Sequence, residues 1–273
     1  MIAVVTDSAA SLPRELAAEL GIEVVPIYLR FGDESVKDEA DPGGFYERLR
    51  AEPQAAATAS PAPGDFVEAY ERAGGDEIVC VTVSATVSGI YQTARLAADM
   101  IGKRVEVVDS GSASMAQGFV AMEAARAARA GAGVEEATAR AADVAARSVL
   151  VAALDTFEYL RRSGRVTRLV SYAGTMLDIK PVFRFTGGSI DAVARPRTRR
   201  RALDRVVAEA RSGIGARPVH LAAVHAAAED DARRALERVS DGAQVVESHV
   251  AGFTPAMGVH TGPGVVGVAW FTD

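Results

Sequence analysis

The segment His-Thr-Gly-Pro-Gly at residues 260–264 joins an imidazole, a hydroxyl and two glycines just before a final apolar run at residues 265–271. We expect these five residues to form a tight turn that can hold a small anion, because glycines let the backbone approach a ligand closely. Two segments far upstream, residues 58–63 and 84–92, are rich in hydroxyl groups and carry no charged side chain. Together the three segments suggest a site that binds a carboxylate through neutral hydrogen-bond donors.

Three loops are expected to share one rim of a parallel sheet, because residues 6–8, 84–88 and 109–114 each follow a short apolar strand. Ligands of open α/β sheets bind outside the carboxyl ends of the strands. Ser88 and Gly89 also begin a predicted helix, where free backbone N–H groups and the helix dipole favour an anion. The alternative interpretation is that Ser88 serves only as the N-cap of that helix.

The other two segments also have purely structural interpretations. Residues 58–63 alternate small residues with prolines, which fixes the backbone and presents the Thr58 hydroxyl, but a plain structural loop has the same pattern. His260 is either a capping or core histidine, or a residue delivered to the site by a helical turn that begins at Thr254 and Pro255.

Patterns for catalysis, nucleotides and metals are weak. Ser88 with His260 as its base would make an acyl-ester hydrolase, but Thr86 stands where a nucleophile elbow requires glycine. Neither G-x-G-x-x-G nor G-x-x-x-x-G-K-[ST] occurs, so we do not expect the chain to bind ATP. The other histidines lack metal-ligand spacing backed by cysteines or carboxylates, so we expect neither a metal nor a cofactor: they are His220, His225 and His249.

Bulk composition limits the partners. At 273 residues and 49% hydrophobic content, the chain is long enough for two domains and two cores. A net charge of −6 and a pI of about 5.4 argue against nucleic acid and leave at most transient contact with an anionic membrane. Cys80 lies in an apolar run, which suits a reducing compartment, and residues 1–6 resemble neither a signal peptide nor a membrane span. We therefore expect a cytoplasmic protein.

Short apolar runs alternate with helical patterns in the first half, which predicts a mainly parallel sheet covered on both faces. Residues 32–65 are polar and proline-rich, and we expect a loop there with one short helix at 45–50. The Ala-rich residues 121–147 predict two helices broken at 131–133. The expected strands of this half lie at 2–5, 22–29, 78–83 and 105–108.

The second half changes pattern. Gly187 and Gly188 separate two apolar runs, which indicates a β-hairpin and antiparallel pairing. Helices are expected near residues 197–211 and 229–239. The prediction is therefore an N-terminal α/β/α domain at residues 1–151 and a C-terminal α+β domain with a largely antiparallel sheet at residues 152–273.

Arginines crowd the start of the helix predicted at residues 197–211. Cations at a helix N-terminus oppose the helix dipole and reduce local stability, which suggests that they dock an acidic or phosphate-bearing partner. The alternative is a solvated basic face neutralised by acids such as Asp204. The docking candidates are Arg197, Arg199, Arg200 and Arg201, next to Arg195. A second group is interpreted as solvated surface: Arg161, Arg162, Arg165 and Arg168.

The order of the motifs resembles that of the DegV family of bacterial fatty-acid-binding proteins. Besides the three hydroxyl- and glycine-containing segments, the resemblance rests on Val-Val-Thr-Asp-Ser at residues 4–8 and Leu-Asp-Ile-Lys-Pro at residues 177–181, and it runs from residue 2 to residue 271. It implies an α/β N-terminal domain, a C-terminal domain built on a largely antiparallel sheet, and a ligand cleft between them.

The resemblance also implies a function. A long-chain fatty acid would lie buried between the domains, and the protein would be a carrier, not an enzyme: the binding subunit of a bacterial fatty acid kinase, which presents its ligand to a separate ATP-using subunit that makes acyl-phosphate. The implied ligand-binding residues are Thr58, Ser88 and His260, with Gly89 and Thr261 beside them. Ala59 stands where the family usually has serine. The alternatives are the hydrolase and a binder of another amphipathic acid, such as a retinoid or bile acid.

Overall fold

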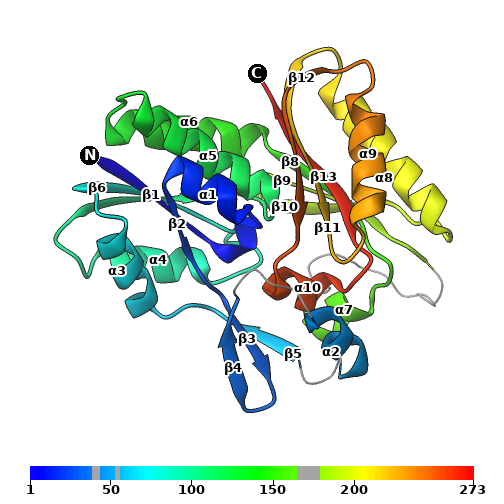
Figure 1. Ribbon diagram of the computed structural model, residues 1–273, viewed down its shortest axis with the longest axis horizontal. Helices are drawn as coiled ribbons and strands as arrows, with labels where there is room; N and C mark the ends of the chain where they lie inside the picture. Colours follow the sequence, from blue (N-terminus) through cyan, green and yellow to red (C-terminus); the bar gives the residue numbers. More distant parts are fainter. Residues whose placement is uncertain (39–43, 53–55, 165–178) are drawn as a thin grey trace.

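Two large β-sheets, with helices between and outside them, organise the chain (Figure 1). The structure is a computed structural model that describes residues 1–38, 44–52, 56–164 and 179–273. No helix in these ranges is both long and apolar enough to cross a membrane.

The first sheet is entirely parallel, with strand order β2-β1-β6-β7. Helices α3 (Pro63–Arg72) and α4 (Ile90–Ala98) pack on one face. Helices α1 (Arg14–Leu20), α5 (Met115–Arg129) and α6 (Val134–Arg147) pack on the other. Because both faces are covered, the strands are short continuous apolar runs. They are β1 (Ile2–Asp7), β2 (Ile22–Val25), β6 (Glu77–Thr82) and β7 (Arg104–Asp109).

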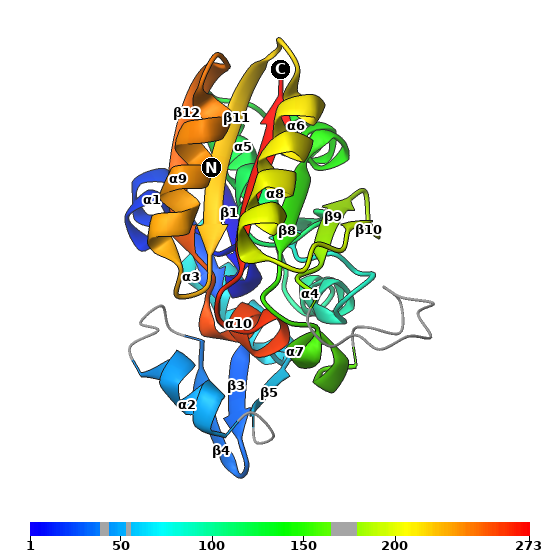
Figure 2. The same ribbon diagram turned by 90° about the vertical axis from the view of Figure 1, so that its right-hand side faces the viewer.

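The second sheet has the order β10-β9-β8-β13-β11-β12 and is antiparallel except for the pair β11 and β12. Helices α8 (Arg199–Ile214) and α9 (Glu229–Ser240) cover its outer face (Figure 2). The predicted hairpin at Gly187 and Gly188 joins β9 to β10. The strands are β8 (Val149–Ala153), β9 (Val182–Thr186), β10 (Ser189–Ala194), β11 (Pro218–His225), β12 (Gln244–Gly252) and β13 (Val266–Thr272). The predicted fold class is confirmed.

Helices α5 and α6 form a shared layer between the two sheets, as both views show (Figures 1 and 2). Every residue of α5 from Met115 to Ala125 is buried. Alanine predominates in this part of the chain, and its small side chain lets two sheets approach one helix from opposite sides while favouring the helical backbone. The second sheet therefore packs directly on helices of the first half.

Two hydrophobic clusters are present in the described part of the chain, but they do not coincide with the two predicted domains. Along β13, Ala269 and Phe271 belong to the cluster that extends into the first half, whereas Val268 and Trp270 belong to the cluster under α8 and α9. Successive residues of a strand face opposite sides of the sheet, so the second sheet itself divides the clusters. The predicted boundary at residue 151 falls inside β8, and the change from one sheet to the other occurs at Ser148.

A small antiparallel sheet, ordered β4-β3-β5, replaces most of the loop predicted at residues 32–65. That prediction was wrong for the described residues, although its short helix is present as α2 (Phe45–Ala51). Pro26 cannot donate to a strand ladder, and the apolar run at 22–29 divides there into β2 and β3. The strands β3 (Tyr28–Phe31), β4 (Glu34–Lys37) and β5 (Ala56–Ala59) are only four residues each, and β4 is exposed throughout. The β4 and β5 sequences show no apolar alternation, whereas β3 alternates buried Leu29 and Phe31 with exposed Arg30.

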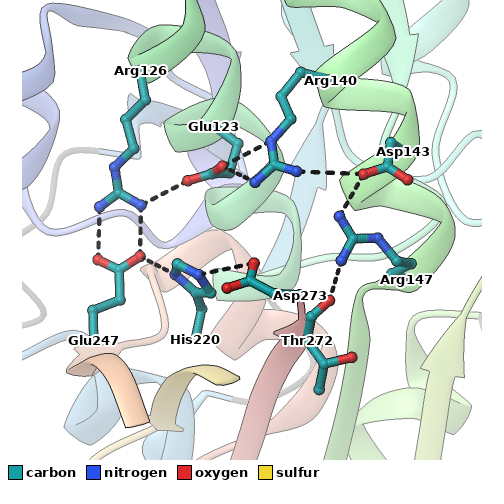
Figure 3. A network of polar contacts seen from close by, with 9 residues as sticks. All are labelled: Glu123, Arg126, Arg140, Asp143, Arg147, His220, Glu247, Thr272 and Asp273. Atoms are coloured by element: carbon teal, nitrogen blue, oxygen red, sulfur yellow. Dashed lines mark hydrogen bonds and ion pairs between the residues drawn. The ribbon is translucent and has the colours of Figure 1, made fainter. Parts of the chain in front are cut away.

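A network of charged groups ties α5 to the second sheet (Figure 3). Arg126 of α5 donates to both carboxylate oxygens of Glu247 on β12, at 2.6 and 2.7 Å, and also to Glu123 at 2.7 Å. Glu247 is further hydrogen-bonded to His220 at 2.6 Å and to His249 at 3.0 Å. Glu123, His220 and Glu247 each have one atom of a type that binds metal ions, and these three atoms lie within 4.8 Å of one another. Sequence spacing did not reveal this grouping.

Guanidinium groups already occupy the two carboxylates of this grouping, because Arg140 pairs with Glu123 while Arg126 pairs with both. The cluster is therefore described as an ion-pair network. Burial would raise the pKa of the Glu247 carboxyl, but the hydrogen bonds from Arg126, His249 and His220 outweigh it and hold the pKa well below its usual range.

Replacing Glu247 by glutamine should lower the free energy of unfolding by about 2 kcal/mol at pH 7, because Arg126 loses its ionised acceptor. A carboxyl whose pKa is depressed by folding stabilises the protein above its unfolded pKa, near 4.5, and loses this contribution as the pH falls through the folded pKa. The difference in the free energy of unfolding between wild type and Glu247→Gln should therefore shrink below pH 4.5. Urea unfolding at several pH values measures it, with Glu237→Gln, an exposed glutamate of α9, as control. Equal stability of Glu247→Gln and wild type at pH 7 would contradict the assignment.

Candidate functional site

An apolar cavity lies between the two halves of the chain, where the carboxyl ends of β1 and β6 face β8, β9 and α10 (Pro255–Thr261). The cavity and its open mouth enclose about 1140 Å³ of space free of protein atoms. Ile27, Val83 and Ile90 line it from the first half. From the second half, Phe183, Phe185 and Ile190 of the β9–β10 hairpin line it.

The tip of this hairpin rests on the first half of the chain. The Gly188 amide donates to the Gly111 carbonyl at 2.7 Å, and the φ angles are +77° at Gly188 and +59° at Gly111. A Cβ atom on Gly111 would lie 3.0 Å from the Gly188 nitrogen. The close approach of the two backbones therefore depends on both glycines.

Five polar residues line the cavity, and three of them are the ones predicted to meet at one carboxylate. Thr58 on β5, Ser88 at the end of the loop before α4, and His260 on α10 all lie in the wall, together with Ser60 and Thr261. Thr58 Oγ1 and His260 Nε2 are hydrogen-bonded at 2.9 Å although 202 residues separate them in sequence. Gly89 is the N-cap residue of α4 and is not part of the wall.

The polar residues of the described wall keep part of their surface exposed. Thr58, Ser88 and His260 are half-buried and Ser60 is exposed, whereas Ile90 and Val265 of the apolar wall are buried. Ser60 was not predicted as a site residue, although it lies two positions after Thr58 and so on the same side of an extended chain. Ala59, where the family usually has serine, is not in the wall.

The three loops predicted to share a rim do meet, but they contribute unequally to the cavity. Asp7 accepts a hydrogen bond from the Val83 amide at 2.8 Å, and the Ser84 amide donates to the Ser112 carbonyl at 2.9 Å. Asp7 is fully buried, which raises the pKa of its carboxyl to about 6, and it is not in the cavity wall. Its carboxylate thus holds the loops together and does not face the ligand.

Gly89, and not Ser88, is the N-cap residue of α4, but Ser88 still bonds to the start of that helix. Its Oγ accepts a hydrogen bond from the Ile90 amide at 3.3 Å, in the first turn of α4, and it also lines the cavity. Ser84 and Thr86 in the same loop share a hydrogen bond of 2.9 Å and do not line it. Since His260 Nε2 is bonded to Thr58 and Ser88 is not bonded to His260, the described contacts do not form a nucleophile and base pair.

The glycine-containing motif is divided between a helix and a turn. The predicted helix start at Thr254 and Pro255 is correct, but α10 continues to Thr261, so the imidazole belongs to its last turn and not to a tight turn. The Thr261 hydroxyl donates to the Met257 carbonyl at 2.9 Å, within the helix. Gly262 ends the helix with a φ of +76°, and a Cβ there would overlap the Tyr159 ring.

The four predicted docking arginines differ in their surroundings. Arg199 donates to Asp231 at 2.6 Å and to the Gly264 carbonyl at 2.8 Å, and it lies 3.6 Å from Asp155. It therefore links the turn after α10 to α8, and its assignment to a docking surface stays a prediction. The other three are exposed and form no ion pair in the described ranges: Arg197, Arg200 and Arg201.

Other predicted motifs are only partly described. Lys180 pairs with Asp155 at 2.6 Å, so the Lys-Pro end of the motif at residues 177–181 joins the same charged group as Arg199. Arg161, in helix α7 (Glu158–Arg162), is exposed as the solvated-surface interpretation predicts, whereas Arg162 is half-buried and pairs with Glu158. Arg165, Arg168, Leu177 and Asp178 lie outside the described residues.

Replacing Gly262 by alanine should lower the free energy of unfolding by about 1–3 kcal/mol, because the new methyl group meets Tyr159 and the backbone is strained at that φ. In a Tyr159→Ala background the same replacement should lower the free energy of unfolding by less, since only the backbone strain remains. Urea unfolding of the four proteins gives this difference, and Gly102→Ala, where a methyl group meets nothing within 4 Å, is the control. An equal cost in both backgrounds would show that the ring is not the obstacle.

Comparison with known proteins places the chain in one family. Residues 1–273 match the family model described as uncharacterised protein, DegV family. A DegV domain-containing protein of Streptomyces coelicolor is 35% identical over 273 residues, covering 98% of this chain and 97% of that protein. Two solved structures have TM-scores of 0.89 and 28% identity, and each covers 100% of this chain and 99% of the other: a fatty-acid-binding DegV family protein of Thermus thermophilus, and DegV of Bacillus subtilis, described as a fatty acid binding protein. The chain therefore belongs to the DegV family.

Proposed function

We propose that the protein binds a long-chain fatty acid, with the acyl chain in the apolar cavity and the carboxylate at Thr58, Ser88 and His260. The observation that carries the proposal is a single cavity whose wall is apolar inside and whose open end joins hydroxyl and imidazole groups from distant parts of the sequence. The two solved relatives of 28% identity, both described as fatty-acid-binding proteins, support it.

The two ends of the cavity would contribute differently to binding. Each buried methylene contributes about 0.8 kcal/mol, so a chain of about fifteen gives on the order of 12 kcal/mol before the cost of association. A hydrogen bond to the carboxylate adds about 1.5–3 kcal/mol. The apolar wall therefore supplies most of the affinity, and the polar end sets which end of the ligand faces the mouth.

Neutral donors at the mouth suit a carrier whose ligand is later modified. A fixed arginine would stabilise the free carboxylate strongly, whereas hydroxyl and imidazole groups can reorient around a changed head group. The carboxylate lies at the open end, where a second protein can reach it. The role that fits these features is the binding subunit of a fatty acid kinase, which presents the carboxylate to a separate ATP-using subunit for acyl-phosphate formation.

The exposed arginines Arg197, Arg200 and Arg201 are the part of the surface assigned to that partner. They lie at the start of α8, and the adjoining Arg199 contacts Gly264 in the turn that follows His260. A cationic surface beside the mouth would attract an acidic or phosphate-bearing partner, and the attraction would weaken as salt rises.

Mass spectrometry of material extracted from the purified protein, together with Ser88→Ala, tests the ligand assignment. We expect a stoichiometric fatty acid, and an affinity for palmitate that falls about 10- to 100-fold in Ser88→Ala while the protein stays folded. Thr93→Ala, which removes a hydroxyl of α4 that does not line the cavity, should bind like wild type. Recovery of a retinoid or bile acid would identify another amphipathic ligand. Esterase turnover lost in Ser88→Ala would support the hydrolase.

Reversing the charge of Arg200 and Arg201 to glutamate tests the docking surface. Palmitate binding should be unchanged, because neither side chain lines the cavity, while acyl-phosphate formation by the kinase subunit with ATP should slow at low salt. Arg14→Glu, at the exposed start of α1, is the matched control. If the reversed protein supports the kinase at the wild-type rate, these arginines are only solvated surface.

A further inference from the structure

The helix that carries His260 belongs to the second half of the chain but is held by the first half. Tyr46 of α2 donates to the Phe253 carbonyl at 3.3 Å, just before α10, and the Thr254 hydroxyl donates to the Ser8 carbonyl at 3.3 Å. At the other end of α10, His260 is hydrogen-bonded to Thr58. The position of the imidazole is therefore decided by contacts between the halves.

Asp38 makes the most direct of these contacts. Its Oδ1 accepts a hydrogen bond from the Ala256 amide at 3.0 Å, and its Oδ2 accepts one from the Ser8 hydroxyl at 2.6 Å. Ser8 Oγ in turn accepts from the Ile27 amide at 3.0 Å, and the Asp38 amide donates to the Ile27 carbonyl at 2.7 Å. Asp38 is only 4% exposed, so its carboxylate is buried, with a hydrogen bond to each oxygen.

The carboxylate of Asp38 replaces a cap that α10 lacks. The N-cap residue Thr254 makes no side-chain capping bond, and α10 is only seven residues long, too short to be stable by itself. Free amide groups and the positive end of the helix dipole attract a carboxylate at this position. Burial raises the pKa of the Asp38 carboxyl, while its bonds to Ser8 and Ala256 act in the opposite direction.

The residue whose amide Asp38 caps lies on the same side of α10 as His260. Ala256 and His260 are four residues apart, about one helical turn, and both line the cavity. A displacement of the first turn is therefore transmitted to the imidazole through a single turn of backbone. At a hydrogen bond of 2.9 Å to Thr58, a shift of about 1 Å is enough to break the contact.

We propose that Asp38 is a positioning residue for His260: by capping α10 from the other half of the chain, it sets the imidazole at the distance at which it joins Thr58 at the mouth of the cavity. The inference deepens the proposed function, on which its effect on ligand affinity rests. The placement of the imidazole itself is independent of what the ligand is.

The test is a double-mutant cycle of Asp38→Ala with His260→Ala, measured as the dissociation constant for palmitate. Asp38→Ala should weaken binding about 10-fold or more in the wild-type background and less than about 2-fold when His260 is already alanine, because a positioning residue has nothing left to position. If the fold-losses of palmitate affinity in the two single variants multiply in the double variant, Asp38 acts independently of His260 and the proposal is wrong.

Two further variants complete the cycle. Asp65→Ala is the matched control, because Asp65 caps α3 by accepting from the Ala62 amide at 2.7 Å and does not contact α10; it should leave palmitate affinity within about 2-fold of wild type. Asp38→Asn keeps an acceptor for the Ala256 amide but loses the charge, so it should retain more affinity than Asp38→Ala. If the alanine variant does not fold, the asparagine variant supplies the same cycle.

A readout without ligand separates this inference from the proposed function. The ring NMR resonances of His260 in the ligand-free protein should shift in Asp38→Ala and stay unchanged in Asp65→Ala. If wild type binds no palmitate while these resonances do shift, the proposed function fails and the positioning role stands. Unchanged resonances in Asp38→Ala would overturn the positioning role whatever the ligand is.

Discussion

Burial of α5 between the two sheets is the constraint on which the site depends. The helix packs on β1 of the first sheet and on β13 of the second, with every residue from Met115 to Ala125 buried. Two sheets that share one helix layer must end side by side, so the loops after β1 and β6 face α10 and the β9–β10 hairpin. The cavity is the space left between them, and neither sheet forms it alone.

Hydrogen bonds between the halves then set the chemistry of the mouth. Asp38 caps α10, Thr58 meets His260, and Gly188 contacts Gly111. Each bond joins a backbone or side-chain group of one half to a partner in the other. A carrier needs its two halves held closely enough to enclose an acyl chain and separable enough to release it, and a few directional bonds around an apolar wall fulfil both conditions.

Charged side chains hold the framework together. Arg126 and Glu247 join α5 to the second sheet, and Arg199 links α8 to the turn at Gly264. The cavity wall itself, within the described residues, has no acidic side chain, lysine or arginine.

The sequence by itself determined the parallel first sheet, the hairpin of the second and the polar residues of the cavity wall except Ser60, because apolar periodicity, paired glycines and hydroxyl-rich motifs are local signals. Tertiary structure alone decided the small sheet of β3, β4 and β5, whose strands of four residues each are too short for a pattern to identify them. It also decided that Arg199 anchors a turn, that His220 and Glu247 meet, and that Asp38 caps α10. Each of these depends on partners far away in sequence, and residue spacing along the chain carries no information about such contacts.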